Sequence, residues 1–236
     1  MVWVVLPTYN ERDNLERLVA AVRERLPESR RLLIVDDNSP DGTGEIADRL
    51  ATEHDDVEVL HRKTKEGLGP AYIAGFRVAL AGGAELVMEM DSDFSHDPAY
   101  IPQLLRAVES ADLAIGSRYV PGGGVTEWGR VRKFISRGGS RYARSVLGVR
   151  IRDLTGGFKV FRRDVLEAID LEDVASLGYA FQVEMTYRAI VAGFRVVEVP
   201  IVFRDRTEGD SKMSKAIVAE AIWRVPAMRM RRRPRP

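Results

Sequence analysis

The sequence predicts an α/β protein whose core is a doubly wound, mostly parallel sheet. Three observations favour this class. Short apolar runs alternate with longer amphipathic stretches along the chain. Apolar residues in the longer stretches recur with the helical period of about 3.6. Polar residues follow directly after several of the apolar runs, where parallel strands would end at one edge of a sheet. Strands and helices that alternate in this way connect through right-handed crossovers.

The expected strands are short and apolar, and helices are expected between them. The strands span residues 2–6, 32–35, 57–60, 84–90, 113–115 and 195–203. Asn10 is the expected N-cap of the first helix, with Asp13 three residues later as in a capping box. Pro98 opens a helix that ends near residue 109, because its missing N–H costs nothing at a helix start. Further helices are expected over residues 131–147 and from residue 181 onwards.

The composition is typical of one soluble globular domain with a short appendage. Hydrophobic residues make up 45% and charged residues 30% of the 236 residues, as in ordinary folded proteins. The absence of cysteine excludes disulfides and thiolate metal sites. We expect a domain over residues 1–215 and an amphipathic helix with an arginine-rich tail over residues 216–236. No apolar run approaches the roughly 18 residues of a spanning helix, and the start of the chain lacks the basic region of a signal peptide.

Charge is unevenly distributed along the chain. The 36 basic and 35 acidic residues give a formal net charge of +1. No acidic residue follows Glu220, whereas six arginines do: Arg224, Arg229, Arg231, Arg232, Arg233 and Arg235. The body of the protein is therefore acidic. Only the arginine-rich tail suggests a nucleic-acid binder, and the acidic body counts against it, because a basic face is expected of such proteins.

Two carboxylates follow the strand expected at residues 84–90. They are Asp91 and Asp93, separated by Ser92. Ligands of open α/β sheets bind outside the carboxyl ends of the strands. Paired carboxylates at such a place suit Mg²⁺ or Mn²⁺ and the phosphates that these ions carry. The alternative is an ordinary strand-to-helix turn in which an aspartate caps the next helix.

Polar residues also follow the first two strands. Tyr9 and Glu11 come after the first, and Asp36 and Asp37 come after the second, although either aspartate could serve only as a helix cap. The first turn has no G-x-G-x-x-G fingerprint, and the chain has no P-loop motif. These strand ends suit a nucleotide that is held through its base and ribose. Its diphosphate would then be neutralised by a metal ion and by Arg or Lys.

Six stretches together resemble the ordered motifs of family 2 glycosyltransferases with the GT-A fold. More narrowly, they resemble dolichol- or polyprenol-phosphate mannose synthases. The stretches are PTYNE (7–11), VDDNSPDGT (35–43), MDSDFSH (90–96), GSRY (116–119), DLTGGF (153–158) and RDRTEGDSKM (204–213). The resemblance covers about residues 2–215. It implies transfer of mannose from GDP-mannose to a polyprenyl (dolichyl-type) phosphate, with inversion and with Mg²⁺ or Mn²⁺.

The resemblance also assigns roles to individual residues. The catalytic residues would be Asp91, Asp93 and Arg118. The nucleotide sugar would contact Pro7, Tyr9, Glu11, Val35, Asp37, Asp91, Ser92, Asp93, Arg118, Arg206 and Lys212. The metal would be bound by Asp91, Asp93 and Ser95, where some relatives have Gln in place of Ser95. The acceptor phosphate would lie near Arg118, Arg132, Lys133, Asp153 and Thr155. Arg118 could instead form an ordinary surface ion pair.

The inferred reaction needs no strong general base. A phosphate monoester has its second pKa near 6, so the acceptor is already largely a dianion at neutral pH. The alternative donor is another nucleotide sugar, UDP-glucose or UDP-GlcNAc, used with a polyprenyl phosphate or another acceptor. The Q-x-x-R-W motif that processive family 2 enzymes carry is absent.

A polyprenyl acceptor places the enzyme at a membrane surface. We expect peripheral association with the cytoplasmic face, through the apolar residues of the last helix, the arginine-rich tail, or a membrane-anchoring partner protein. Trp223 favours the membrane interface, and basic residues are attracted to anionic lipids. The alternatives are that the tail is disordered and solubilising, and that helix 131–147 simply covers the sheet.

Overall fold

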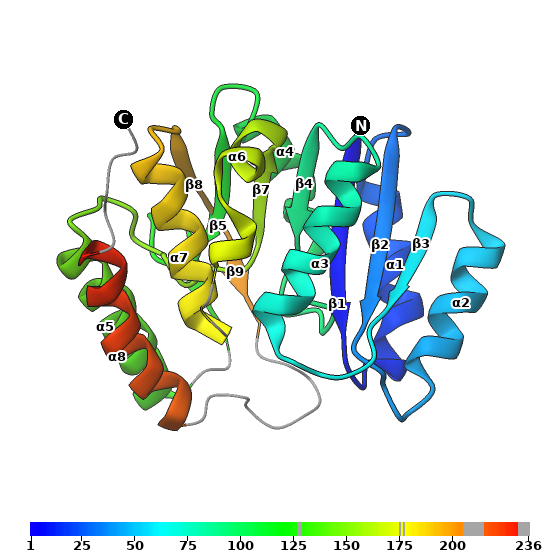
Figure 1. Cartoon of the computed structure of the whole chain (residues 1–236), viewed down its shortest axis with the longest axis horizontal. Helices are drawn as coiled ribbons and strands as arrows, with labels where there is room; N and C mark the ends of the chain where they lie inside the picture. Colours follow the sequence, from blue (N-terminus) through cyan, green and yellow to red (C-terminus); the bar gives the residue numbers. More distant parts are fainter. Residues whose placement is uncertain (127–128, 175, 177, 205–214, 231–236) are drawn as a thin grey trace.

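The computed structural model describes residues 1–126, 129–174, 176, 178–204 and 215–230. A seven-stranded sheet with the order β3-β2-β1-β4-β7-β5-β8 forms its centre (Figure 1). Its strands are β1 (Val2–Thr8), β2 (Arg30–Asp36), β3 (Val57–His61), β4 (Leu86–Glu89), β5 (Leu113–Ser117), β7 (Lys159–Arg162) and β8 (Val196–Pro200). Only β7 runs antiparallel to its neighbours among these strands. The predicted mostly parallel α/β sheet is confirmed.

Eight α-helices surround the sheet in the described part of the chain. They are α1 (Arg12–Arg25), α2 (Thr43–Glu53), α3 (Leu68–Ala81), α4 (Ile101–Ala107), α5 (Arg130–Leu147), α6 (Arg163–Ala168), α7 (Gly178–Val191) and α8 (Lys215–Met230). A second small sheet pairs β6 (Gly124–Val125) with β9 (Val202–Phe203). Short 3-10 turns span Pro98–Tyr100 and Leu171–Asp173.

The sheet is buried on both faces, as alternate residues of β1 illustrate. Val4 and Leu6 pack in one core cluster with α1 and α4. Trp3 and Val5 pack in the other with α3 and α7. Successive side chains of a strand point to opposite faces, so a parallel strand covered on both sides must be apolar throughout. This explains the continuous apolar runs in the sequence, and each fully buried Val or Leu stabilises the fold by about 1.5–3 kcal/mol.

Two local expectations were wrong. Asn10 does not cap α1; Glu11 occupies the cap position without a side-chain bond, and Asn10 has a left-handed φ of 58°, a conformation that Asn tolerates. The strand expected at residues 195–203 divides at Ile201, and its two parts join different sheets. The helix start expected at Pro98 is confirmed, although its first turn is a 3-10 turn, which Asp97 caps by accepting the N–H of Ala99 at 2.9 Å.

The end of α8 is part of the folded domain. Figure 1 shows α5 and α8 side by side, beyond the β8 edge of the sheet. Val225 and Met228 of α8 are buried in a cluster with Leu147 of α5 and Val183 of α7. The basic residues 231–236 lie outside the described residues. Within the described part of the chain, no helix has both the length and the apolar character to cross a membrane.

Candidate functional site

The turn after β4 carries Asp91 and Asp93, and three side-chain contacts fix it. Ser92 donates from Oγ to the carbonyl oxygen of Pro7 at 2.9 Å, which ties the turn to the end of β1. The backbone N–H of Asp91 donates to Nδ1 of His96 at 3.0 Å. Asp93 accepts from the N–H of Ser95 at 3.1 Å. The two carboxylates therefore belong to a preformed turn at the carboxyl edge of the sheet.

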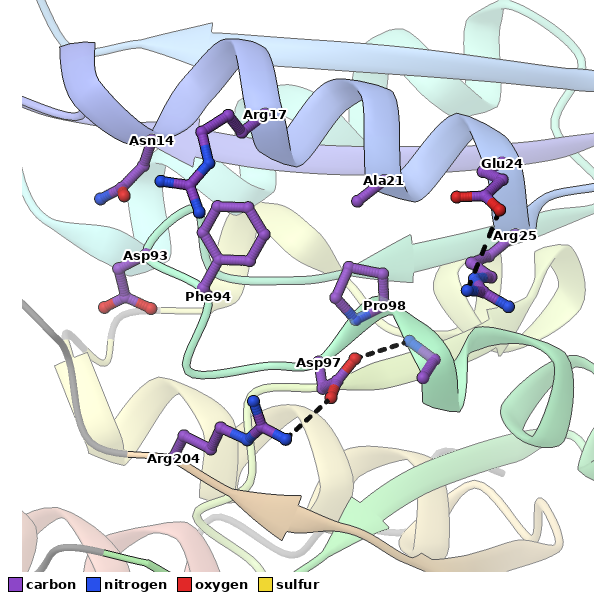
Figure 2. Close-up of a pocket in the computed structure, with 11 residues that line it drawn as sticks. Asn14, Arg17, Ala21, Glu24, Arg25, Asp93, Phe94, Asp97, Pro98 and Arg204 are labelled. Carbon is purple, nitrogen blue, oxygen red and sulfur yellow. Dashed lines mark hydrogen bonds and ion pairs between the residues drawn. The ribbon is translucent and has the colours of Figure 1, made fainter.

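Phe94 lies in this turn with a φ of 59°, a conformation that costs a bulky residue about 1–3 kcal/mol. Packing offsets the cost, because Phe94 contacts the core and the guanidinium of Arg17 lies 5.4 Å from the centre of its ring. Figure 2 shows both side chains beside Asp93, in a pocket of about 420 Å³ between α1 and the turn. Arg204 closes the other side of the pocket, 3.8 Å from Asp97.

His96 is a structural residue of the turn rather than a base. Its ring stacks on Phe158 at 5.0 Å and meets the ring of Phe203 edge-on at 5.5 Å. Burial lowers the pKa of His96, against the opposing charges of Asp91 and Asp93. The neutral ring accepts the Asp91 N–H through Nδ1, so the proton of this tautomer lies on Nε2.

The residues of this turn fit a hard divalent cation. Asp91 and Asp93 offer carboxylate oxygens, and Asp91 also accepts from the Tyr72 hydroxyl at 3.2 Å. The Ser95 Oγ is buried, and within the described residues it has no hydrogen-bond partner. The same residues contain no group of three or more His, Cys, Asp or Glu placed to bind a metal. A cation here would take its remaining ligands from Ser95, a diphosphate or water, as Mg²⁺ commonly does.

Five of the residues predicted to contact the nucleotide sugar lie at the ends of β1 and β2, namely Pro7, Tyr9, Glu11, Val35 and Asp37. The Glu11 N–H donates to the Thr43 hydroxyl at 3.0 Å, which joins the two turns. The ammonium of Lys65 lies 3.5 Å from the centre of the Tyr9 ring. The N–H of Asp37 donates to the carbonyl oxygen of Thr8 at 3.1 Å at this edge. The side chain of Val35 lies in the core, and its carbonyl oxygen accepts from the Thr8 hydroxyl at 3.3 Å.

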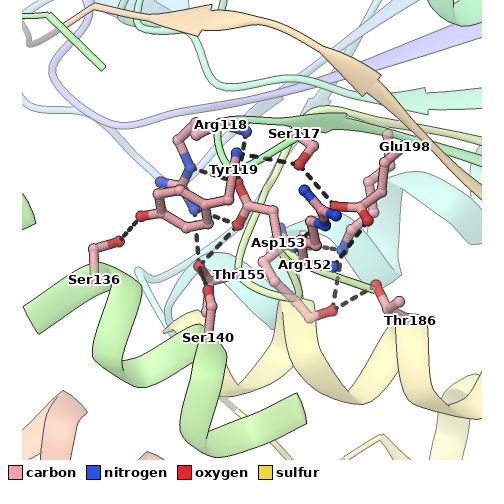
Figure 3. Close-up of polar contacts among 12 residues, drawn as sticks. Ser117, Arg118, Tyr119, Ser136, Ser140, Arg152, Asp153, Thr155, Thr186 and Glu198 are labelled. Atoms are coloured by element: carbon pink, nitrogen blue, oxygen red, sulfur yellow. Dashed lines mark hydrogen bonds and ion pairs between the residues drawn. The ribbon is translucent and has the colours of Figure 1, made fainter. Parts of the chain in front are cut away.

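Arg118 forms a buried ion pair with Asp153. Its Nε and Nη2 donate to the two carboxylate oxygens at 2.7 Å each, and Nη2 also donates to the Thr155 hydroxyl at 2.8 Å (Figure 3). Burial raises the pKa of Asp153, but the charge and the hydrogen bonds of Arg118 outweigh it and lower the pKa overall. The alternative that Arg118 forms a surface ion pair is wrong. Three of the residues predicted to lie near the acceptor phosphate, Arg118, Asp153 and Thr155, are thus in direct contact.

Glu198 supports this network from β8, and nothing in the sequence marks it beyond its place as one acid in an apolar strand. Its carboxylate accepts from the Ser117 hydroxyl at 2.7 Å and from the Asp153 N–H at 2.9 Å. On the other side, the Tyr119 hydroxyl donates to Ser136 of α5 at 2.6 Å (Figure 3). The Arg118 and Asp153 segments are therefore attached to both β8 and α5.

A second buried ion pair lies behind the site. The Lys159 ammonium is 3.2 Å from Oε1 of Glu89 and donates to the carbonyl oxygen of Gln182 at 3.0 Å. Neither charged side chain is exposed. Burial raises the pKa of Glu89 to about 7 against the pull of Lys159. This pair joins β4, which leads to Asp91, to its antiparallel neighbour β7.

Three of the predicted phosphate-binding side chains are not described. Arg206 and Lys212 lie outside the described residues, and of Arg132 the structure describes only the backbone, in α5. Lys133 lies half-buried on the first turn of α5. The roles of these four residues stay predictions.

Comparison with known proteins gives consistent likenesses. The profile of glycosyl transferase family 2 matches residues 3–170. Undecaprenyl-phosphate mannosyltransferase of Micrococcus luteus is 52% identical over 224 residues, covering 95% of this chain and 92% of that protein. Polyprenol monophosphomannose synthase of Mycolicibacterium smegmatis is 51% identical over 224 residues, covering 94% of this chain and 84% of that protein.

Solved structures support the same architecture. Glucosyl-3-phosphoglycerate synthase from Mycobacterium tuberculosis, crystallised with Mn²⁺, UDP-glucose and phosphoglyceric acid, superposes with a TM-score of 0.67 at 19% identity. The match covers 95% of this chain and 79% of that one. A mycobacterial protein superposes with a TM-score of 0.70 at 18% identity, covering 97% and 74%. At such identities the likeness shows the fold, which is GT-A.

Proposed function

Because this chain belongs to glycosyltransferase family 2, we propose that it transfers mannose from GDP-mannose to a polyprenyl phosphate with inversion. The observation that carries the proposal is the near full-length likeness to two proteins named as polyprenyl-phosphate mannose transferases. The geometry supports it. A carboxylate pair suited to a nucleotide diphosphate lies on the same edge of the sheet as a buried arginine network suited to a second phosphate.

The nucleophile in this reaction is an oxygen of the acceptor phosphate. It attacks the anomeric carbon as the bond to the departing diphosphate breaks, so the anomeric configuration inverts. The phosphate is largely dianionic at neutral pH and needs no proton removed. His96 is not available as a base through Nδ1, which already accepts the Asp91 N–H. The task of the protein is therefore to orient two anions and to stabilise the leaving diphosphate.

Asp91, Asp93 and Ser95 would hold Mg²⁺ or Mn²⁺ at the donor diphosphate. The buried Ser95 Oγ, which has no hydrogen-bond partner in the described residues, supports its inclusion. A divalent cation supplies charge neutralisation of the departing diphosphate oxygens. The preformed turn holds both carboxylates in place before the donor arrives, which reduces the reorganisation required in the reaction.

Arg118 would contact the acceptor phosphate together with Thr155. Asp153 balances the charge of Arg118, so this pair orients a phosphate more than it neutralises one. Net positive charge would come from Arg132 and Lys133 of α5 and from Arg206 and Lys212. Arg suits bidentate phosphate contacts, whereas Lys acts as a point charge.

The enzyme would work on the cytoplasmic face of a membrane as a peripheral protein, alone or with a membrane-anchoring partner. Large apolar side chains support this proposal. Phe134 of α5 is 79% exposed, and Trp223 and Met230 of α8 are 81% and 79% exposed. Exposed apolar residues on adjoining helices are typical of surfaces that meet a membrane or a protein.

The configuration of the product tests the proposed reaction. The donor GDP-mannose is an α-glycoside, so an inverting transfer yields a β-mannosyl phosphate. Proton and carbon NMR of the purified lipid product should show the β-anomer. An α-linked product would contradict direct attack by the acceptor phosphate and would indicate a covalent or otherwise retaining mechanism.

A further inference from the structure

Arg62 belongs to the donor edge, but no role in the reaction described above uses it. It follows β3 directly, and its N–H donates to the Asp36 carbonyl oxygen at 2.8 Å, which extends the strand pairing. Its Nη1 donates to Oδ1 of Asp37 at 2.5 Å, and its Nη2 donates to Glu66. Only 11% of the side chain is exposed. Arg62 is therefore held at both ends of its guanidinium, in a fixed orientation.

Asp37 has capacity left for a ligand. Its N–H donates to the Thr8 carbonyl oxygen at 3.1 Å, which places it beside the end of β1. Oδ2 accepts no hydrogen bond from the described residues. This oxygen is also not one of their buried polar atoms without a partner. Oδ1 accepts from Arg62 and retains a second lone pair. The neighbouring Asp36 differs, because Ser39 occupies its carboxylate through both Oγ and N–H.

We propose that Arg62 is a specificity-determining residue for the nucleotide base and that, with Asp37, it recognises the edge of guanine. The inference rests on the proposed function, since it takes the donor to be a guanosine diphosphate sugar. Guanine presents two adjacent N–H donors, N1 and N2, and then the O6 acceptor. The Asp37 carboxylate matches the two donors, and a guanidinium N–H of Arg62 matches O6.

Other bases match this pair poorly. Uracil presents a single N–H between two carbonyl oxygens, so one oxygen of Asp37 would face a carbonyl oxygen. Adenine presents a lone pair at N1, which the carboxylate would repel. A site built to hydrogen-bond a ligand rejects an analogue that leaves its polar groups unpaired. The pair therefore favours guanine by unfavourable contacts with other bases as well as by its own hydrogen bonds.

Arg62 also favours the form of Asp37 that recognition needs. Burial raises the pKa of Asp37 above its ordinary value, and the charge and hydrogen bond of Arg62 oppose this rise. A protonated carboxyl would offer one acceptor fewer. By donating to Oδ1, Arg62 both orients the carboxylate and favours its ionised state.

Calorimetric titration of the full chain with GDP, UDP and inosine diphosphate at saturating Mn²⁺ tests the proposal. Wild type should bind GDP more tightly than UDP. It should also bind GDP more tightly than inosine diphosphate, which lacks the 2-amino group. Arg62→Met should lower the affinity for GDP by about 10- to 100-fold, the effect of losing one hydrogen bond to a charged group. UDP should change by less than about threefold on the same basis, since it gains little from Arg62.

Two further variants serve as controls for Arg62→Met. Arg62→Lys keeps the charge next to Asp37 but loses the planar guanidinium. Its affinity for GDP should therefore fall between those of wild type and Arg62→Met. Arg49→Met removes an exposed arginine that pairs with Glu16 and Glu53 on the surface, and it should bind all three nucleotides as wild type does.

The outcomes separate this inference from the proposed donor. A wild-type preference for GDP that persists in Arg62→Met, or an equal loss of GDP and UDP binding, overturns the role of Arg62 alone. Equal wild-type affinity for GDP and inosine diphosphate overturns the placement of the guanine edge on Asp37. A wild type that prefers UDP overturns the guanosine donor, and the guanine recognition with it.

Discussion

The guanidinium of Arg118 and the carboxylate of Asp153 share two hydrogen bonds of 2.7 Å, with 4% and 0% of their side chains exposed. Asp153→Asn leaves the arginine charge buried without its partner, which typically costs about 3–5 kcal/mol. We expect the free energy of unfolding in urea to fall by that amount, and transfer activity to fall with it. Asp173→Asn, which breaks an exposed pair with Arg188, should change stability by less than about 1 kcal/mol.

The same pair predicts a pH dependence of stability. The folded state lowers the pKa of Asp153. The ion pair therefore contributes its full stabilisation at pH values above the pKa of the unfolded chain, near 3.8. Its contribution is lost as pH falls through the lowered folded value. The stability difference between wild type and Asp153→Asn should therefore be constant from about pH 5 to 7 and shrink in stronger acid. A difference that grows on acidification would contradict the pairing.

Asp93→Asn should abolish most transfer while the fold survives. An asparagine can still accept the Ser95 N–H through its side-chain oxygen, so the turn is preserved, but the charge that would hold a cation and a diphosphate is lost. Positioned electrostatic groups are commonly worth about 10²–10³ in rate. Initial rates with and without EDTA measure the effect. Asp170→Asn, which alters a carboxylate that accepts from the N–H two residues later in the same way, is the matched control. Full activity in Asp93→Asn or in EDTA would exclude the metal role.

Glu89 and Lys159 should show strong coupling in stability. Glu89→Gln alone leaves a buried ammonium unpaired and should cost about 3–5 kcal/mol. Glu89→Leu with Lys159→Met replaces both charges by apolar groups of similar size, which is often neutral or stabilising. Urea unfolding of wild type, Glu89→Leu, Lys159→Met and the double variant gives the coupling energy. Additive losses in the double variant would show that the two charges do not stabilise each other.

The exposed apolar residues of α5 and α8 should govern membrane binding. Sedimentation with vesicles of phosphatidylcholine and phosphatidylglycerol measures this binding. The affinity for the vesicles should fall by about tenfold in Phe134→Ser or Trp223→Ser, consistent with about 1.5–3 kcal/mol for one large apolar side chain. Val191→Ser, at an exposed apolar position on α7, is the control. Truncation after Met230 keeps the buried Val225 and Met228 while removing four arginines. This truncation should abolish the salt dependence of vesicle binding. Unchanged binding in all variants would exclude this surface.

The sequence predicted the parts of the fold and site that depend on local pattern. The apolar runs gave β1, β2 and β4, and their polar ends gave Asp37, Asp91 and Asp93 at one edge. It could not predict β7, a short strand that begins with a buried lysine, because its apolar character is weak. The Glu89 and Lys159 pair is 70 residues apart in sequence, and Glu198 is a single acid in an apolar strand. Such partners are brought together only by the tertiary fold, so no local pattern marks them.

Transfer of label from nucleotide sugars into a lipid extract tests the central claim most directly. The full chain is incubated with Mn²⁺, a polyprenyl phosphate and radiolabelled GDP-mannose, UDP-glucose or UDP-GlcNAc, and the organic phase is counted. We expect label from GDP-mannose alone, dependent on the polyprenyl phosphate and lost in EDTA. Label that enters the lipid only from UDP-glucose or UDP-GlcNAc, or that appears without added polyprenyl phosphate, would contradict the account.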